Sequence, residues 1–429
     1  NVYVSTFPFM GLHPIPAAVG KPFTVFAMVG LINAINHSDG LDGLAGGESL
    51  LSFGCIAYLA YAAGGLDLVT IAVATIGGVF GFLRFNSHPA RVFMGDGGSQ
   101  FLGFTLGYLT VLLTQYVNSA LSPALPALIL GLPIMDILAV LYLRASHGQN
   151  LFRATKNHVH HRLLMLGFDH YGAVVIIYSV QAFFVVSAVF LRYQSDLAVL
   201  GVYLGTCALL FLGLTIAEKR GWQVGHVGQP GPVGQLIVHA KAHGYVAKVP
   251  SVLIGILVPS YLLGMSIAIG QVPEDFAVGA LALFGVLMVS LVLKERPQAL
   301  QHRIVVYVTA AFVVYLSGKT HLLNAHSLEV FDVAYYLTVA ASLALAIRYT
   351  FDGLFTLTPM DYLVALGVLL VGAASGGNLA GSAAAPMLVK VIILFYAAEW
   401  LISRETRRWN GLFLSVMGAL LLLGVRGLM

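Results

Sequence analysis

The sequence predicts an all-α, polytopic integral membrane protein. Of its 429 residues, 59% are hydrophobic and only 9% are charged, and the mean hydropathy is +0.88. Soluble domains carry roughly one charged residue in four. Apolar stretches recur along the whole chain, each near the roughly 20 residues that a helix needs to span a bilayer. Strands of a membrane barrel would be about half as long and would alternate in polarity, so helices are predicted.

We expect about 14 transmembrane helices along this chain. Basic residues near span ends stay in the cytoplasm. With the loop after the first span on that side, 17 of the 22 Lys and Arg residues are cytoplasmic, which supports both the number and the direction of the spans. The expected spans are approximately 22–36, 48–65, 67–84, 99–117, 122–143, 171–193, 197–217, 251–270, 276–293, 304–318, 333–347, 361–376, 387–402 and 410–427.

The net charge of +4 is explained by a cytoplasmic surface that faces anionic lipid headgroups, so no nucleic acid partner is expected. The two cysteines, Cys55 and Cys207, both fall inside expected spans and predict no disulfide framework.

A polar segment rich in Gly and Pro, residues 218–250, separates two hydrophobic blocks. It predicts a cytoplasmic linker, in which a hairpin around GQPGPVG and a flexible connector are both open. The linker joins a membrane core, residues 1–217, to an additional helical bundle of unknown role, residues 251–429. In that bundle Glu399 lies near a span end, where snorkelling to the interface explains it more simply than function does.

The first polar cluster is NAINHSDGLDGLAGG, residues 33–47. Its polar residues step by three, so neighbours share a helix face, and its glycines allow the helix to open toward one ligand. An ordinary cytoplasmic loop is the alternative. Carboxylates without a basic partner at a membrane boundary are costly unless a cation joins them, which favours a functional site. The polar residues are Asn33, Asn36, Asp39 and Asp42.

The second cluster is RFNSHPARVFMGDGGSQFLG, residues 84–103. Asp96 is flanked by glycines, and Ser99 is predicted to cap a helix that follows it. Backbone N–H groups at such a turn suit phosphate, and the carboxylate suits Mg²⁺. A tight turn without function is the alternative.

The third cluster is LFRATKNHVHHRLLMLG, residues 151–167, in which His158, His160 and His161 lie among basic residues. No cysteine and no second pair of ligating residues completes a tetrahedral zinc site. An anionic pyrophosphate therefore fits these histidines better as a ligand. A basic membrane-surface loop is the alternative. Two expected spans separate each cluster from the next, so all three face the cytoplasm and form one candidate site.

Four ordered motifs, NAINHSDGLDGLAGG, FNSHPARVFMGDGGSQFLG, LPIMDILAVLYLR and HVHHRLLMLG, resemble the polyprenyl-phosphate N-acetylhexosamine-1-phosphate transferases of glycosyltransferase family 4. The resemblance covers about residues 1–217. The HVHH form followed by RLL is more similar to the bacterial undecaprenyl-phosphate GlcNAc-1-phosphate transferases than to the phospho-MurNAc-pentapeptide translocase.

The resemblance implies transfer of GlcNAc-1-phosphate from a UDP-N-acetylhexosamine to undecaprenyl phosphate, the first membrane step of a cell-surface polysaccharide pathway. It implies Mg²⁺ as cofactor, with Mn²⁺ as an alternative, and Asp96 as its ligand. It places the protein in the bacterial inner membrane with a cytoplasmic active site, and it includes a second copy of the chain among the expected partners. The implied catalytic residues are Asp39, Asp42, Asp96 and His160, and the implied substrate-binding residues are Asn33, Asn36, Asn86, His158, His161 and Arg162.

One departure concerns the family's DDxxD motif, because this chain contains no DD pair. Since the chain begins with Asn1, we expect that the N-terminal helices of the family core, which carry this motif, precede it. The alternatives are a transporter or flippase of lipid-linked or nucleotide sugars and a catalytically inactive family member. A transporter should place polar groups near the bilayer midplane, whereas these clusters lie at span ends, which favours the enzyme.

Overall fold

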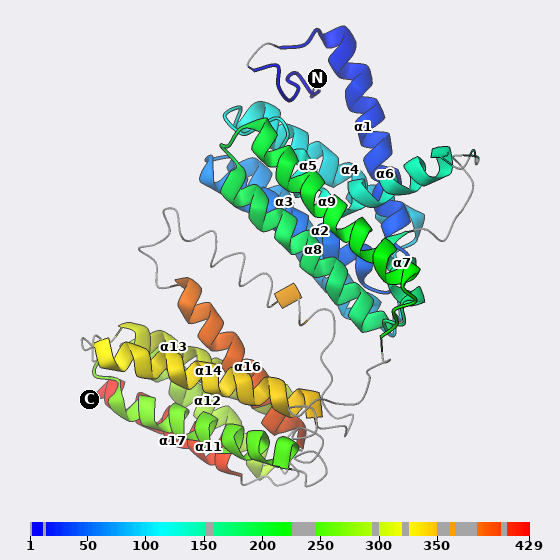
Figure 1. Ribbon diagram of the computed structural model, residues 1–429. Helices are drawn as coiled ribbons and strands as arrows, with labels where there is room; N and C mark the ends of the chain where they lie inside the picture. Colours follow the sequence, from blue (N-terminus) through cyan, green and yellow to red (C-terminus); the bar gives the residue numbers. More distant parts are fainter. Residues whose placement is uncertain are drawn as a thin grey trace. The chain divides into compact units, whose positions relative to one another are not determined.

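The computed structural model describes residues 2–11, 14–146, 148, 150, 158–224, 245–293, 300–319, 326–349, 361, 363–364, 384–404 and 410–429. These residues form helices joined by loops and turns, with no strand among them (Figure 1). The predicted all-α class is therefore confirmed for the part of the chain that is described. The chain divides into two compact units, Asn1–Gly228 with Leu357–Gly376, and Gln229–Thr356 with Gly377–Met429.

The first unit contains the three polar clusters. Its helix α1 packs along α4, and α2 packs between α3 and α8 (Figure 1). Apolar side chains cover these helices on most faces, so the hydrophobic core of the unit runs through the middle of the bundle. The helices are α1 (Ala17–Ser38), α2 (Leu44–Ala62), α3 (Leu66–Asn86), α4 (Gly95–Leu112) with a π-helical turn (Leu113–Val117), α5 (Pro126–Ile129), α6 (Gly131–Ser146), α7 (Val159–Met165), α8 (His170–Leu191) and α9 (Asp196–Lys219).

The expected span 122–143 is interrupted where α5 ends and α6 begins. Gly131 packs so closely against Phe184 that a Cβ atom there would overlap the ring. The side chain of Gln181, which is fully buried, accepts a hydrogen bond from Leu132 N at 2.9 Å and donates one to Ile129 O at 3.1 Å. A break in an apolar helix is tolerated because this amide supplies hydrogen bonds to the backbone groups that lose their helical partners at the break.

The second unit has its own hydrophobic core. Glu399 does not simply extend toward an interface: it accepts hydrogen bonds from Arg303 and Tyr307, so the carboxylate is neutralised inside the unit. The helices are α11 (Tyr245–Ala268), α12 (Glu274–Val292), α13 (Leu300–Lys319), α14 (His326–Tyr349), α16 (Ala384–Arg404) and α17 (Gly411–Leu428).

Seven of the described helices, α1, α3, α8, α9, α11, α13 and α17, are long and apolar enough to cross a membrane. The chain is thus a multi-pass membrane protein, but the expected count of about 14 spans is not confirmed. Most of the expected span 361–376 lies outside the described residues, as do residues 225–244 of the expected linker. The domain boundaries at 217 and 251 stay predictions.

Candidate active site

The first cluster forms a short loop between α1 and α2. Helix α1 ends at Ser38, and Gly43 adopts φ +81°, a conformation that glycine reaches without strain. Tyr178 of α8 fixes this loop by donating a hydrogen bond to Gly43 O at 2.7 Å. Gly40 lies directly against the His160 imidazole, where a Cβ atom would overlap the ring. The loop of the first cluster therefore contacts the third cluster.

Asp96 joins the second cluster to the same place. The Asn36 side chain donates to Asp96 Oδ1 at 3.1 Å and to Ser99 Oγ at 2.8 Å. The predicted capping role of Ser99 is wrong: α4 begins at Gly95, so Ser99 lies inside the helix and Asp96 lies in its first turn. The exposed Asp96 carboxylate thus lies at the positive end of α4 and points into the region shared with α1.

The loop carboxylates have opposite electrostatic environments. Burial first, and then the charges of Asp42 and Asp96, raise the pKa of Asp39. Burial also raises the pKa of Asp42, but hydrogen bonds from Ala90 N at 3.0 Å and from His88 Nδ1 at 2.8 Å outweigh it, so that the pKa of Asp42 is lowered. Asp39 and Asp96 are therefore like charges in one neighbourhood, and this donor set fits a hard divalent cation such as Mg²⁺.

These two environments predict that replacing Asp39 and replacing Asp42 with Asn have opposite effects on stability. The comparison is made at pH 7 with EDTA present, so that no metal ion is bound. The folded state binds the Asp39 proton more tightly than the unfolded state does, so stability falls as the pH rises above the ordinary aspartate pKa, and Asp39→Asn is expected to raise the melting temperature. Asp42 contributes stability above its ordinary pKa, which is lost as the pH falls through its lowered folded pKa. Asp42→Asn is expected to cost about 1–2 kcal/mol, because charge-assisted hydrogen bonds are lost.

Thermal unfolding of the two variants in the same detergent measures this contrast. Repeating the scans at lower pH provides the control, because the gain in melting temperature of Asp39→Asn should shrink as the pH falls toward the ordinary aspartate pKa. A melting temperature that falls equally in both variants at pH 7 would contradict the assignment of Asp39 as a destabilising carboxylate.

The third cluster is held by a buried aspartate that the sequence reasoning did not single out. Asp136 of α6 accepts a hydrogen bond from Val159 N at 2.9 Å, and its Oδ2 lies 2.8 Å from His158 Nδ1. All three residues are buried. The available signal was a lone carboxylate in the otherwise apolar motif LPIMDILAVLYLR. Asp136 fixes the start of α7 and the orientation of the His158 ring.

His160 lies beside this pair and is also buried. Burial first, and then the neighbouring His161, lower the pKa of His160 to about 4, and Asp136 only partly opposes them. His160 is thus a neutral imidazole at pH 7 and supplies one N–H donor, not a positive charge. A cavity of about 10 Å³, which is roughly the volume that one water molecule needs, lies among His160, Asp136 and the buried Glu48.

Three predicted substrate-binding residues have other partners. Arg162 makes two hydrogen bonds of 2.7 Å to the Glu218 carboxylate. Asn33 donates to Val29 O in its own helix at 2.8 Å, and its contact with substrate stays a prediction. The buried Asn86 accepts from Gly43 N at 3.0 Å and donates to Val92 O at 2.9 Å, so it joins two loops. His161 lies against His160 with ring centroids 4.2 Å apart.

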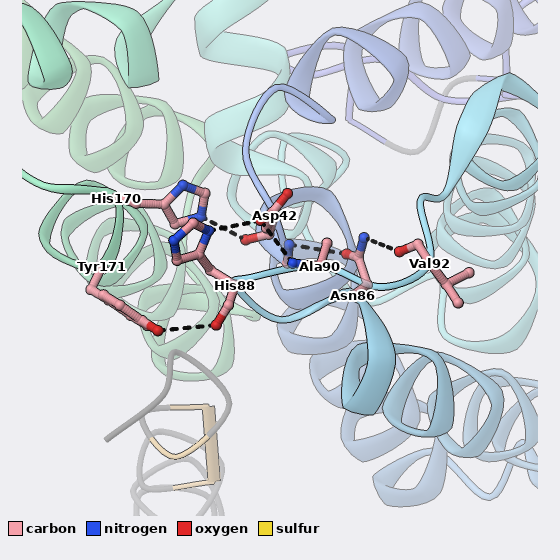
Figure 2. Close-up of polar contacts among 8 residues, drawn as sticks. Asp42, Asn86, His88, Ala90, Val92, His170 and Tyr171 are labelled. Atoms are coloured by element: carbon pink, nitrogen blue, oxygen red, sulfur yellow. Dashed lines mark hydrogen bonds and ion pairs between the residues drawn. The ribbon is translucent and has the colours of Figure 1, made fainter. Parts of the chain in front are cut away.

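Two further histidines surround Asp42 (Figure 2). His88, in the loop after α3, contacts the Asp42 carboxylate, and His170 Nε2, at the start of α8, lies 3.2 Å from Asp42 O. Their rings stack with centroids 4.1 Å apart. The sequence reasoning missed both, because only the tertiary structure brings residues 42, 88 and 170 together.

The fold and this geometry define a multi-pass helical membrane protein with a site of aspartates and histidines at the ends of its helices. Residues 2–114 match glycosyl transferase family 4. This is the family that the four motifs indicate, and the match confirms that resemblance for the first part of the chain.

Curated relatives match the chain over longer stretches than this family model does. The chain is 36% identical over 200 residues to a probable undecaprenyl-phosphate N-acetylglucosaminyl 1-phosphate transferase of Bacillus subtilis, covering 47% of this chain and 55% of the relative. It is 31% identical over 230 residues to the undecaprenyl-phosphate alpha-N-acetylglucosaminyl 1-phosphate transferase of Escherichia coli O157:H7, covering 52% and 62%.

A phospho-N-acetylmuramoyl-pentapeptide-transferase of Desulfitobacterium hafniense is 37% identical over 183 residues, covering 39% of this chain and 52% of the relative. The chain therefore spans about half the length of the curated relatives that it matches, and relatives with two different sugar substrates match it with similar identity.

Proposed function

We propose that this protein transfers N-acetylhexosamine-1-phosphate from a UDP-sugar to undecaprenyl phosphate. One observation carries the proposal: the first cluster, residues 33–47, contacts both other clusters. Asn36 near the end of α1 donates to Asp96, and Gly40 in the loop after α1 lies against His160. Carboxylates for a cation and imidazole donors for a diphosphate thus converge on one small region.

In the proposed reaction an oxygen of the lipid phosphate attacks the phosphorus that carries the sugar. The bond from that phosphorus to the UMP oxygen breaks, UMP leaves, and a lipid diphosphate sugar is formed. Asp96 and Asp39 would hold Mg²⁺, which when bound offsets the negative charge of the phosphates.

The chain's own residues position these groups. Asn36 orients the Asp96 carboxylate with its amide, and the hydrogen bond from Ala90 keeps Asp42 ionised in the loop between α1 and α2. His160 would donate its single N–H to a phosphate oxygen, while Asp136 holds the adjacent His158 ring in place.

The HVHH segment and the relatives from B. subtilis and E. coli support GlcNAc as the transferred sugar. UDP-sugars are cytoplasmic, so we place the site on the cytoplasmic side of the bacterial inner membrane, at the first membrane step of cell-surface polysaccharide synthesis. Mg²⁺ is the proposed cofactor, with Mn²⁺ as an alternative, and a homodimer is a proposed assembly. The role of the second unit is outside this proposal.

The native protein that contains this chain tests the proposal. Purified in detergent with undecaprenyl phosphate and Mg²⁺, it should release UMP from UDP-GlcNAc and form the lipid product, as measured by chromatography and mass spectrometry. EDTA should stop both, and UDP-MurNAc-pentapeptide should react at least about tenfold more slowly, which corresponds to about 1.4 kcal/mol of discrimination. Sugar uptake into proteoliposomes without any UMP would instead support a transporter.

A further inference from the structure

Asp42, His88 and His170 come from three separate elements and converge on one point (Figure 2). Asp42 lies in the loop between α1 and α2, His88 in the loop after α3, and His170 in the first turn of α8. One carboxylate oxygen and one nitrogen from each ring all lie within 4.8 Å of one another. Each of the three residues is partly exposed, so a small ion can reach them.

We propose that these three residues bind one Zn²⁺ ion at a site distinct from the Asp96 carboxylate. Two imidazoles and one carboxylate are a donor set that suits zinc, whereas Mg²⁺ prefers oxygen ligands alone. Three protein ligands leave the fourth tetrahedral position open for water or a phosphate oxygen. The proposal does not depend on the transferase activity.

The distances are compatible with this ion. His88 Nδ1 and Asp42 Oδ2 are 2.8 Å apart, and the two ligand atoms would be roughly 3.4 Å apart around a tetrahedral zinc with bonds of about 2.1 Å. The zinc would replace the proton that His88 and Asp42 now share. The rings of His88 and His170 stack with centroids 4.1 Å apart and 20° from parallel. His88 contacts the Asp42 carboxylate, and His170 Nε2 lies 3.2 Å from the Asp42 backbone oxygen.

The surrounding contacts fix the ligands. Tyr171 donates a hydrogen bond from its hydroxyl to His88 O at 3.0 Å, and Asn86 joins Gly43 N to Val92 O beside the cluster (Figure 2). These contacts fix the backbone of the loops that carry His88 and Asp42, and outer contacts that hold the ligands in place are part of most metal sites. The competing explanation is a hydrogen-bonded clamp around Asp42 that binds no metal.

Zinc binding to the untagged, metal-free native protein tests the proposal. Titration against a chromophoric chelator, with the bound metal counted by mass spectrometry, should show one Zn²⁺ per chain that a millimolar excess of Mg²⁺ does not displace. His88→Gln and His170→Gln should each weaken binding by at least about tenfold. His161→Gln, which removes a partly exposed histidine of the neighbouring HVHH segment, should bind zinc as the native protein does.

Co²⁺ substitution gives a second readout, because a tetrahedral site produces intense visible absorption that the two glutamine variants should lose. Melting curves without metal establish that these variants are folded. The proposal is overturned if the native protein binds no zinc, if the glutamine variants retain it, or if His161→Gln abolishes it. None of these results would change the UMP assay, so the two proposals fail separately.

Discussion

Replacing Asp96 with Asn is expected to lower the rate of UMP release by at least about 100-fold, the largest effect on activity that the site predicts. The amide has the shape of the carboxylate and can still accept the hydrogen bond from Asn36, so the fold should persist. It cannot supply the negative charge that a divalent cation needs. Initial rates over a range of Mg²⁺ concentrations, with the melting temperature alongside, measure the effect.

Asp67→Asn is the matched control, because Asp67 is also an exposed aspartate in the first turn of a helix, α3. Its rate should stay within about twofold of the native protein, as for a surface substitution. A rate for Asp96→Asn that equals the control would remove Asp96 from the mechanism and with it the proposed metal ligand.

Asp136→Ala is expected to produce the largest loss of stability, about 3 kcal/mol in the free energy of unfolding. The alanine leaves the buried His158 ring and the Val159 N–H without their acceptor. Asp136→Asn should lose less, because its side-chain carbonyl can still accept from Val159 N. Denaturant unfolding in detergent, with UMP release at a temperature where each variant is folded, measures both effects.

Asp169→Ala serves as the control for the loss of an aspartate hydrogen bond at a helix start. Asp169 caps α8 by accepting from Gly172 N at 2.8 Å, but it is exposed, so its removal should cost only about 1 kcal/mol. An equal loss of unfolding free energy in Asp136→Ala and Asp169→Ala would show that burial of the Asp136–His158 pair does not increase its contribution to stability. Full activity in folded Asp136→Ala would show that the orientation of His158 does not matter for the reaction.

The polar clusters show which parts of the site are predictable. Asp39, Asp96 and His160 stand out in the sequence, because charged and imidazole groups are rare in so apolar a chain. The structure brings Asp96 and His160 into contact with the first cluster, at Asn36 and at Gly40, as the even number of expected spans between the clusters suggests. The number of spans is less predictable, since apolar runs such as residues 122–143 satisfy a length rule whether or not the helix is continuous.

Partners across the fold could not be predicted. Arg162 has the charge expected of a phosphate ligand, yet Glu218 on α9, 56 residues away, holds it. Asp136 lies in an apolar motif, and its importance comes from His158 and Val159, which approach it from the start of another helix. A pairing of this kind depends on which helix faces pack together, and sequence spacing does not specify that.

The sequence by itself determined the class of protein, the resemblance to a family and the three clusters, because composition and local motifs depend only on which residues are neighbours along the chain. The tertiary structure alone decided which carboxylate has a raised pKa, which imidazole is neutral, and that Asp42 lies beside His88 and His170. Burial and distance set the energy of a charge, and both exist only after the helices have packed.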